Sequence, residues 1–369
     1  MEEVIKAKPV RQGGIDLFRI ISMFMVIVIH VNGAGGILRN PLNTAWSPVW
    51  VIGSIIQVFC VVAVNCFALI SGYVYVGKKT KIKSIINLWI QAFFISVVAY
   101  AIKVLLNEES FSLTMLIKQM LFITFNKWWY FTAYFLLFFF IPIFNSAIEK
   151  CGKVLMGLLI IVFGIIFCGM AYASPHDVLG LINGYSFLWL AYLYLVGAYV
   201  KRYDFKIKIK GQPIKTGYYF LLYVIFTVLH LLVELVSSYF NGWASVPVQA
   251  NYMYIFNFLA SVSLLIFFAN VKIKSSKTLL FFSSTTFGVY LLHTAIGMTD
   301  RFAFLLNYHW VITILAILGF AIIIYLGCTV LEYLRQLLFK ACKIPNATDK
   351  LQNLLTEKYE RLKTKYEEN

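Results

Sequence analysis

Charged residues are scarce in this sequence. Asp, Glu, Lys and Arg make up only 13% of its 369 residues, against about a quarter in a soluble globular protein. Hydrophobic residues make up 61%, and apolar runs of about 20 residues, each long enough to cross a bilayer, recur along the chain. This balance excludes a soluble globular protein and predicts a multi-pass membrane protein.

Acidic residues are scarcer still, at 16 against 32 Lys and Arg, which gives a formal net charge of +16. In a soluble protein that excess would suggest nucleic acid as a partner. Here the lysines cluster between alternate apolar runs, which is the sidedness signal of a membrane protein and not a continuous basic patch. We therefore expect membrane lipids around the chain and no nucleic acid.

Cysteine and histidine are also few, with 6 and 5 residues. The cysteines have no metal-binding or redox spacing and lie mostly inside apolar runs, so we interpret them as packing residues. No two histidines of the apolar runs are close in sequence, and acidic neighbours are few. The sequence therefore predicts no metal site.

The apolar runs predict an all-α integral membrane protein with ten transmembrane helices. The expected spans are 15–34, 49–71, 84–106, 128–148, 153–173, 184–200, 217–239, 252–270, 279–297 and 310–334. Ten spans place both termini on one side, and most Lys and Arg residues lie on that side, which makes it cytosolic. We expect a membrane domain over 1–340 and a cytosolic amphipathic tail over 341–369, which either self-associates or packs under the bundle.

A further helical stretch, SLTMLIKQMLFITFNK, follows the third span and is too short and polar to cross the membrane. It is expected on the outer surface. Two interpretations are open, a plain interfacial helix and a lid or re-entrant element over an outer opening.

The first span, GGIDLFRIISMFMVIVIHVNGAGG over 13–36, places an arginine and a histidine inside an apolar helix. Arg19 and His30 are eleven positions apart, which puts them on nearly the same helical face about 16 Å apart. Asp16 is three residues before Arg19 and can pair with it. Intramembrane charge is costly, at about 2.5 to 3.5 kcal/mol for an arginine at a helix centre. This helix therefore predicts a site; the plainer interpretation of Arg19 is an arginine that snorkels to the headgroups.

Other polar side chains are expected at the depth of His30. His230 and Glu234 are one turn apart on the seventh span, and His293 lies late in the ninth span. Each also has a structural interpretation, as a buried pair or a satisfied interfacial histidine. Trp129 and Tyr130 begin the fourth span at its outer end, where an aromatic belt is the default interpretation.

Four elements in order resemble the integral-membrane acyltransferase family 3, over nearly the whole chain. They are IDLFR followed after ten residues by His30, FALISGYVYV with Ser71, KWWYFTAYF with Trp129 and Tyr130, and FGVYLLH with Tyr290 and His293. The chain differs from many relatives at Lys78 and Lys79, where they carry arginine, and at Asn126 and Lys127, where they carry histidine before the tryptophan.

The resemblance implies transfer of an acyl group, commonly acetyl, from cytosolic acyl-CoA to a hydroxyl of a glycan or glycolipid at the outer side of a bacterial cytoplasmic membrane. It implies His30 as the catalytic residue, either as general base for direct transfer or as the carrier of an acyl-enzyme, and Arg19 as a group that holds the donor's anionic or carbonyl groups. Donor and acceptor contacts are expected from Asp16, Ser71, Trp129, Tyr130, Tyr290, His293, His230 and Glu234. No permanently bound cofactor is expected, since acetyl-CoA is a substrate, and no oligomeric state is indicated.

Two other classes of function fit ten spans with intramembrane charge. A transporter or flippase for a small solute or lipid-linked sugar would line a path with the same polar residues, and usually shows an internal repeat. No convincing repeat of the polar pattern appears in the two halves. A membrane sensor or assembly factor with a degenerate site is the third class, and it would bind no acyl donor.

Overall fold

The computed structural model describes residues 11–38, 40, 42–173, 177–240, 251–298 and 300–367. Most of them are helical, which confirms the predicted all-α fold. The one sheet within these residues is a short hairpin of β1 (Lys208–Ile209) and β2 (Gln212–Pro213).

Each of the ten predicted apolar segments forms a helix. The elements in chain order are α1 (Gly13–Ile29), the π-helix η1 (His30–Ala34), α2 (Pro48–Val61), α3 (Ala63–Tyr75), α4 (Ile82–Leu105), α5 (Leu113–Met120), α6 (Trp129–Ala173), the 3-10 turn η2 (Ile182–Gly184), α7 (Phe187–Arg202), α8 (Thr216–Phe240), α9 (Ile255–Asn270), α10 (Lys277–Ile296), the 3-10 turn η3 (Ala303–Asn307), α11 (Trp310–Ala341) and α12 (Ile344–Glu367).

Three of these segments differ in continuity from the prediction. The second span is divided into α2 and α3 at Val62. The fourth and fifth spans are joined in α6, which bends at Gly152, where φ is 70° and ψ is 176°. A positive φ is costly for a residue with a Cβ, so the glycine allows the chain to reverse there.

Six helical segments are long and apolar enough to cross a membrane by length and composition. They are Gly13–Ala34, Pro48–Tyr75, Ile82–Leu105, Trp129–Tyr172, Thr216–Ser237 and Trp310–Ala341. The bent α6 contributes one of them although it contains two predicted spans, and α7 and α9 have only 16 residues each. The chain is therefore a multi-pass membrane protein, while the count of ten and the cytosolic side remain predictions.

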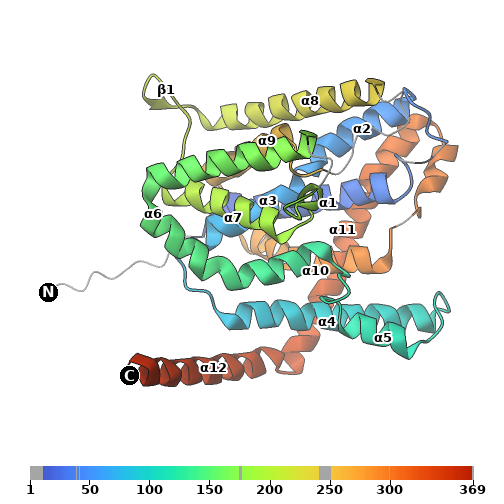
Figure 1. Cartoon of the computed structure of the whole chain (residues 1–369). Coiled ribbons are helices and arrows are strands. Elements are labelled where there is room, and N and C mark those ends of the chain that lie inside the picture. Colours follow the sequence, from blue (N-terminus) through green and yellow to red (C-terminus); the bar gives the residue numbers. More distant parts are fainter. Residues whose placement is uncertain are drawn as a thin grey trace.

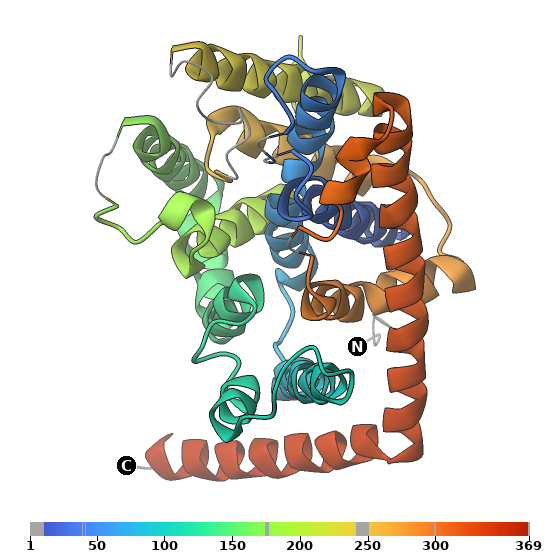
Figure 2. The ribbon, with the colours of Figure 1, turned by 90° about the vertical axis from the view of Figure 1, so that its right-hand side faces the viewer.

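Helix α1 lies at the centre of the molecule and packs against α2, α3, α9, α10 and α11. In Figure 1, α8 runs along the top and α4 and α12 along the bottom, with α1, α3 and α7 between them. Figure 2 shows α11 standing along one edge, with α12 leaving its lower end. The polar residues of α1 are therefore surrounded by other helices.

Glycines allow α3 and α7 to touch at the backbone. A Cβ at Gly72 would collide with the carbonyl oxygen of Tyr194, and a Cβ at Gly197 would collide with that of Leu69. Small residues at such crossings are typical of membrane helices, where close backbone approach supplies the packing energy. This crossing fixes the end of α3 that carries Ser71.

The two non-spanning predictions also correspond to helices. The short stretch after the third span forms α5, which has no buried residue, and the tail forms α12. Near the start of α12, Asp349 pairs with Lys83, and Gln352 accepts a hydrogen bond of 2.7 Å from the backbone N–H of Lys83. The tail therefore packs against the beginning of α4, which is one of the two arrangements expected for it.

Candidate active site

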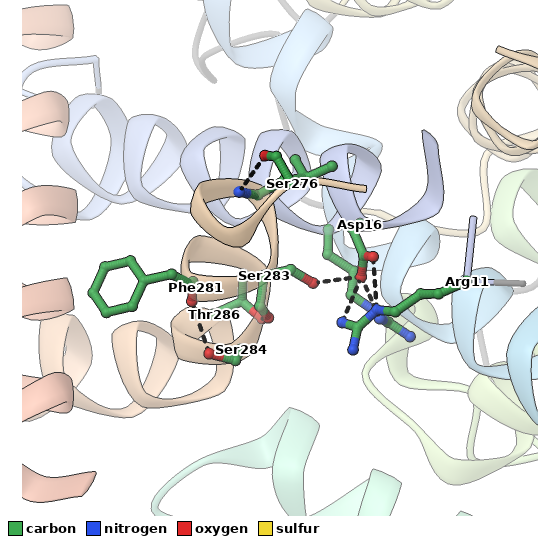
Figure 3. A network of polar contacts seen from close by, with 9 residues as sticks. Arg11, Asp16, Ser276, Phe281, Ser283, Ser284 and Thr286 are labelled. Atoms are coloured by element: carbon green, nitrogen blue, oxygen red, sulfur yellow. Dashed lines mark hydrogen bonds and ion pairs between the residues drawn. The ribbon is translucent and has the colours of Figure 1, made fainter. Parts of the chain in front are cut away.

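A buried carboxylate lies at the beginning of α1. Asp16 is only 1% exposed, and it accepts two hydrogen bonds of 2.8 Å from the guanidinium of Arg11 and one of 2.8 Å from the hydroxyl of Ser283 on α10. Arg19 donates a fourth at 3.2 Å, which confirms the predicted pair. Figure 3 shows Arg11 and Ser283 converging on this carboxylate. The Asp16 carboxylate raises the pKa of Arg11 above its usual value, and together these contacts fix α1 against α10.

Cationic side chains gather around this end of α1. The Arg19 side chain is 26% exposed and keeps only one contact with Asp16. Lys78, after α3, has its pKa lowered by partial burial and by the charges of Arg19 and Lys201. Positive charges that act on one another in this way favour an anion between them. This group lies on the predicted cytosolic side.

His30 and His293 meet at the other end of α1. His293 Nε2 lies 3.1 Å from His30 Nδ1. His30 Nδ1 is also 2.9 Å from the carbonyl oxygen of Val26, and His293 Nδ1 is 2.8 Å from that of Val289. His293 is fully buried, whereas His30 is partly exposed. The contact is made where α1 widens into the π-helix η1, whose first residue is His30.

These distances assign the tautomers of the pair. A carbonyl oxygen only accepts hydrogen bonds, so each Nδ1 must carry its proton in the neutral ring. His293 Nε2 is then unprotonated, and it shares the Nδ1–H of His30 with the carbonyl oxygen of Val26. The Nε2 of His30 is left with its lone pair, and it is the nitrogen able to take a proton from a substrate.

Aromatic side chains extend from the histidine pair toward the middle of the bundle. The Tyr290 ring centroid lies 6.1 Å from that of His293, and Tyr130 on α6 lies 6.3 Å from Tyr290 and 6.4 Å from Phe67 on α3. The Tyr130 hydroxyl is buried and has no hydrogen-bond partner among the described residues. A buried hydroxyl without a partner is costly, so it is available to a bound ligand.

The row of aromatic side chains continues from Tyr130 toward Arg19. Tyr134 is one helical turn from Tyr130 on α6, and its hydroxyl lies beside Ser71 and Tyr75 of α3, within electrostatic range of Arg19. The Ser71 hydroxyl donates a hydrogen bond of 2.9 Å to the carbonyl of Phe67. Polar-headed aromatic side chains therefore connect the arginine and histidine ends of α1.

The two tryptophans at the start of α6 have different surroundings. The Trp129 ring packs on Tyr185 and Tyr252, with centroids 4.5 and 5.9 Å away. Trp128 is buried and donates a hydrogen bond of 2.7 Å to the hydroxyl of Thr294, next to His293. Trp128 therefore supports the histidine pair more directly than Trp129, although the sequence favoured Trp129.

Residues 12–333 match the family model of an acyltransferase domain, acyltransferase family 3. The chain belongs to this family. No curated protein and no solved structure matches it. The match runs from the residue before α1 into α11 and so includes both histidines of the pair, Asp16 and Arg19, and it identifies the protein as a membrane acyltransferase.

One predicted polar pair of the acyltransferase lies on a helix outside this site. His230 Nε2 and Glu234 Oε1 are 3.5 Å apart on α8, both nearly buried, and His230 faces the ring of Tyr254 with centroids 5.5 Å apart. Helix α8 packs on α9 and α2. Of the three histidines expected at one depth, only His30 and His293 come into contact.

The sequence analysis missed a second buried charge in the acyltransferase. Glu332 on α11 is 1% exposed and accepts hydrogen bonds from Arg335, Gln336 and Gln91, at distances of 2.7 to 3.1 Å. Gly288 on α10 leaves room for its carboxylate, which a Cβ there would strike. The i,i+3 pairing of Glu332 and Arg335 in an apolar helix was a usable signal. The network joins α4, α10 and α11 at Gly288.

Metal-binding groups are not assembled at the site. Among the described residues, no group of three or more His, Cys, Asp and Glu side chains could hold a metal ion.

Proposed function

We propose that this acyltransferase moves an acyl group, acetyl in the first instance, from cytosolic acyl-CoA to a hydroxyl of a glycan or glycolipid at the outer side of a bacterial cytoplasmic membrane. The observation that carries the proposal is the histidine pair. Its contacts leave His30 Nε2 as the one ring nitrogen of the pair with a free lone pair.

The reaction at His30 transfers one proton and one acyl group. His30 Nε2 takes the proton of the acceptor hydroxyl as the oxygen attacks the thioester carbonyl carbon. The new ester C–O bond forms and the C–S bond breaks, and the proton held on His30 Nε2 passes to the thiolate of CoA, which leaves as the thiol while His30 returns to its neutral form. A positioned general base of this kind contributes about 10²- to 10⁴-fold.

His293 is the positioning residue in this scheme. Its unprotonated Nε2 accepts from the Nδ1–H of His30 before and during the transfer, so the positive charge that develops on His30 is stabilised without a second proton transfer. The buried hydroxyl of Tyr130 is free to donate to the thioester oxygen as negative charge develops on it. Tyr290 lies between these groups.

The donor side of the site is the end of α1 around Arg19. Arginine binds phosphate and carbonyl oxygens well because its guanidinium is planar and stays charged. The eleven residues from Arg19 to His30 span about 16 Å, so a donor held at Arg19 can extend an acyl arm to His30. This spacing supports cytosolic acyl-CoA as donor and an acceptor approaching from the opposite side.

The test is mass spectrometry of surface glycans from cells with and without the protein. We expect the glycans of cells with the protein to be heavier by one acetyl group. Cells that carry only the His30→Ala variant should lack this added mass. Unchanged glycans, together with movement of an unmodified glycan that consumes no acyl-CoA, would contradict the proposal and favour a transporter.

A further inference from the structure

A polar cavity of about 300 Å³ lies beside the cationic end of α1. It is formed by the residue before α1, the ends of α7 and α9, and one turn of α3. Its polar and aromatic lining consists of Gln12, Tyr73, Lys201, Asp204, Phe205 and Asn270. Ligand pockets usually have volumes of about 300 to 1,000 Å³, so the cavity has room for one nucleoside-sized group.

The lining offers the contacts that an adenine base uses. Phe205 lines the cavity and is 38% exposed, and an exposed aromatic ring provides a stacking surface for a base. The amide of Asn270 donates to the carbonyl of Ile266 at 2.8 Å, and its oxygen accepts from no described residue. Gln12 is exposed and presents a second amide. Asn and Gln amides pair with the N6 and N7 edge of adenine.

The cations at the cavity fit a ligand with several phosphates. Lys201 Nζ lies 4.8 Å from the centroid of the Tyr73 ring, which holds the ammonium at the cavity wall. Lys78 is within electrostatic range of both Lys201 and Arg19. Asp204 is already paired with Lys206 at 2.9 Å. The local excess of positive charge is therefore complementary to a polyanion.

We propose that this cavity binds the adenine nucleotide end of the acyl-CoA donor, with its phosphates among Lys201, Lys78 and Arg19 and its acyl arm directed along α1 to His30. The inference rests on the proposed function and assigns the part of the molecule that recognises the donor. The nucleotide is then bound at the Arg19 end of α1, and the histidine pair lies at the other end.

The experiment compares two acetyl donors on the purified full-length protein. Acetyl-CoA carries the nucleotide, whereas acetyl-pantetheine has the same thioester arm without it. For Lys201→Gln we expect the ratio of kcat/KM for acetyl-CoA to that for acetyl-pantetheine to fall about tenfold, as for the loss of one charge-assisted contact. The control Lys215→Gln removes an exposed lysine outside the cavity lining, and its ratio should match that of the unmodified protein.

A second measurement uses the unmodified protein and does not depend on folding of a variant. Adenosine 3′,5′-bisphosphate should compete with acetyl-CoA and leave acetyl-pantetheine turnover unaffected. An equal effect of Lys201→Gln or of the bisphosphate on both donors, or an effect on neither, would overturn the assignment of the cavity.

Failure of the proposed function gives a different result. If neither donor supports transfer, the acyltransfer proposal fails, and equilibrium binding of labelled CoA still tests the cavity. Binding that weakens about tenfold in Lys201→Gln but not in Lys215→Gln would support the nucleotide site. Binding that is absent, or equal in the two variants, would contradict it.

Discussion

His293 Nε2 lies 3.1 Å from His30 Nδ1, although 263 positions separate the two residues. The contact needs both a π-helical end of α1 and the packing of α10 against α1, which the Asp16–Ser283 hydrogen bond holds from the other end. Because His293 is a second acceptor for the His30 Nδ1–H beside the Val26 carbonyl, its substitution should impair the base without removing it.

The first prediction concerns His293. His293→Phe removes one of the two acceptors of the His30 Nδ1–H and leaves the Val26 carbonyl. We expect kcat/KM for acyl transfer to fall about 10- to 100-fold, as for partners that orient a metal-binding histidine. His293→Gln keeps an acceptor oxygen and should recover part of that loss, and the two variants should differ in their pH–rate profiles. Unchanged activity of His293→Phe would show that the pair has no role in the reaction.

The second prediction concerns Asp16. Asp16→Asn leaves Arg11 and Arg19 without their carboxylate, and breaking a buried ion pair costs about 3 to 5 kcal/mol, less where one partner is exposed, as Arg11 is. Ser283→Ala removes one neutral donor and should cost only about 1 kcal/mol. Thermal midpoints in detergent should therefore fall much further for Asp16→Asn. Equal midpoints would contradict a charge-based role for this network.

The third prediction concerns the crossing of α3 and α7. Gly72→Ala and Gly197→Ala should each lower the thermal midpoint and the activity, because the added Cβ forces the two backbones apart at Ser71. Gly327→Ala on α11 is the matched control, since nothing lies within 4 Å of its Cβ, and it should be neutral or slightly stabilising. Similar midpoints for all three variants would show that the crossing tolerates separation.

The fourth prediction concerns Lys127, which precedes α6. Burial and the charge of Lys103, partly offset by Glu109, lower the pKa of its ammonium from 10.5 to about 8. Between these pH values the unfolded chain holds the proton and the folded protein does not, so stability rises as pH increases from about 8 to 10.5. Lys127→Met should remove this rise. The thermal midpoints of the unmodified protein and of Lys127→Met are measured between pH 8 and 10.5. Parallel pH profiles of the two proteins would contradict a lowered pKa of Lys127.

The helices and the first half of the site could be predicted because the signals are local. Apolar runs locate the helices, and Asp16 and Arg19 are three residues apart, so their pairing follows from helix geometry alone. The Arg19–His30 spacing likewise needs only a continuous helix. The amphipathic pattern of the tail was also sufficient to predict α12.

The remaining contacts of the site are tertiary and have no local signal. Depth in the membrane suggested His230 as readily as His293, but only helix packing determines which helix faces α1. Tyr134 was not selected because one tyrosine among 23 carries no distinguishing pattern. Its role depends on Ser71 and Tyr75 of α3 lying opposite it. The bend at Gly152 joins two predicted spans in one helix, and sequence length alone cannot set that boundary.

The most direct test of the account is transfer of labelled acetyl from acetyl-CoA to the glycan acceptor by purified protein in a bilayer, comparing unmodified protein, His30→Ala and His309→Ala. His309 is exposed at the start of α11 and serves as the control histidine. We predict that the unmodified protein and His309→Ala transfer the label, while His30→Ala falls by about 10²-fold or more. Transfer by His30→Ala at the rate of the unmodified protein would contradict the assignment of His30 as the base.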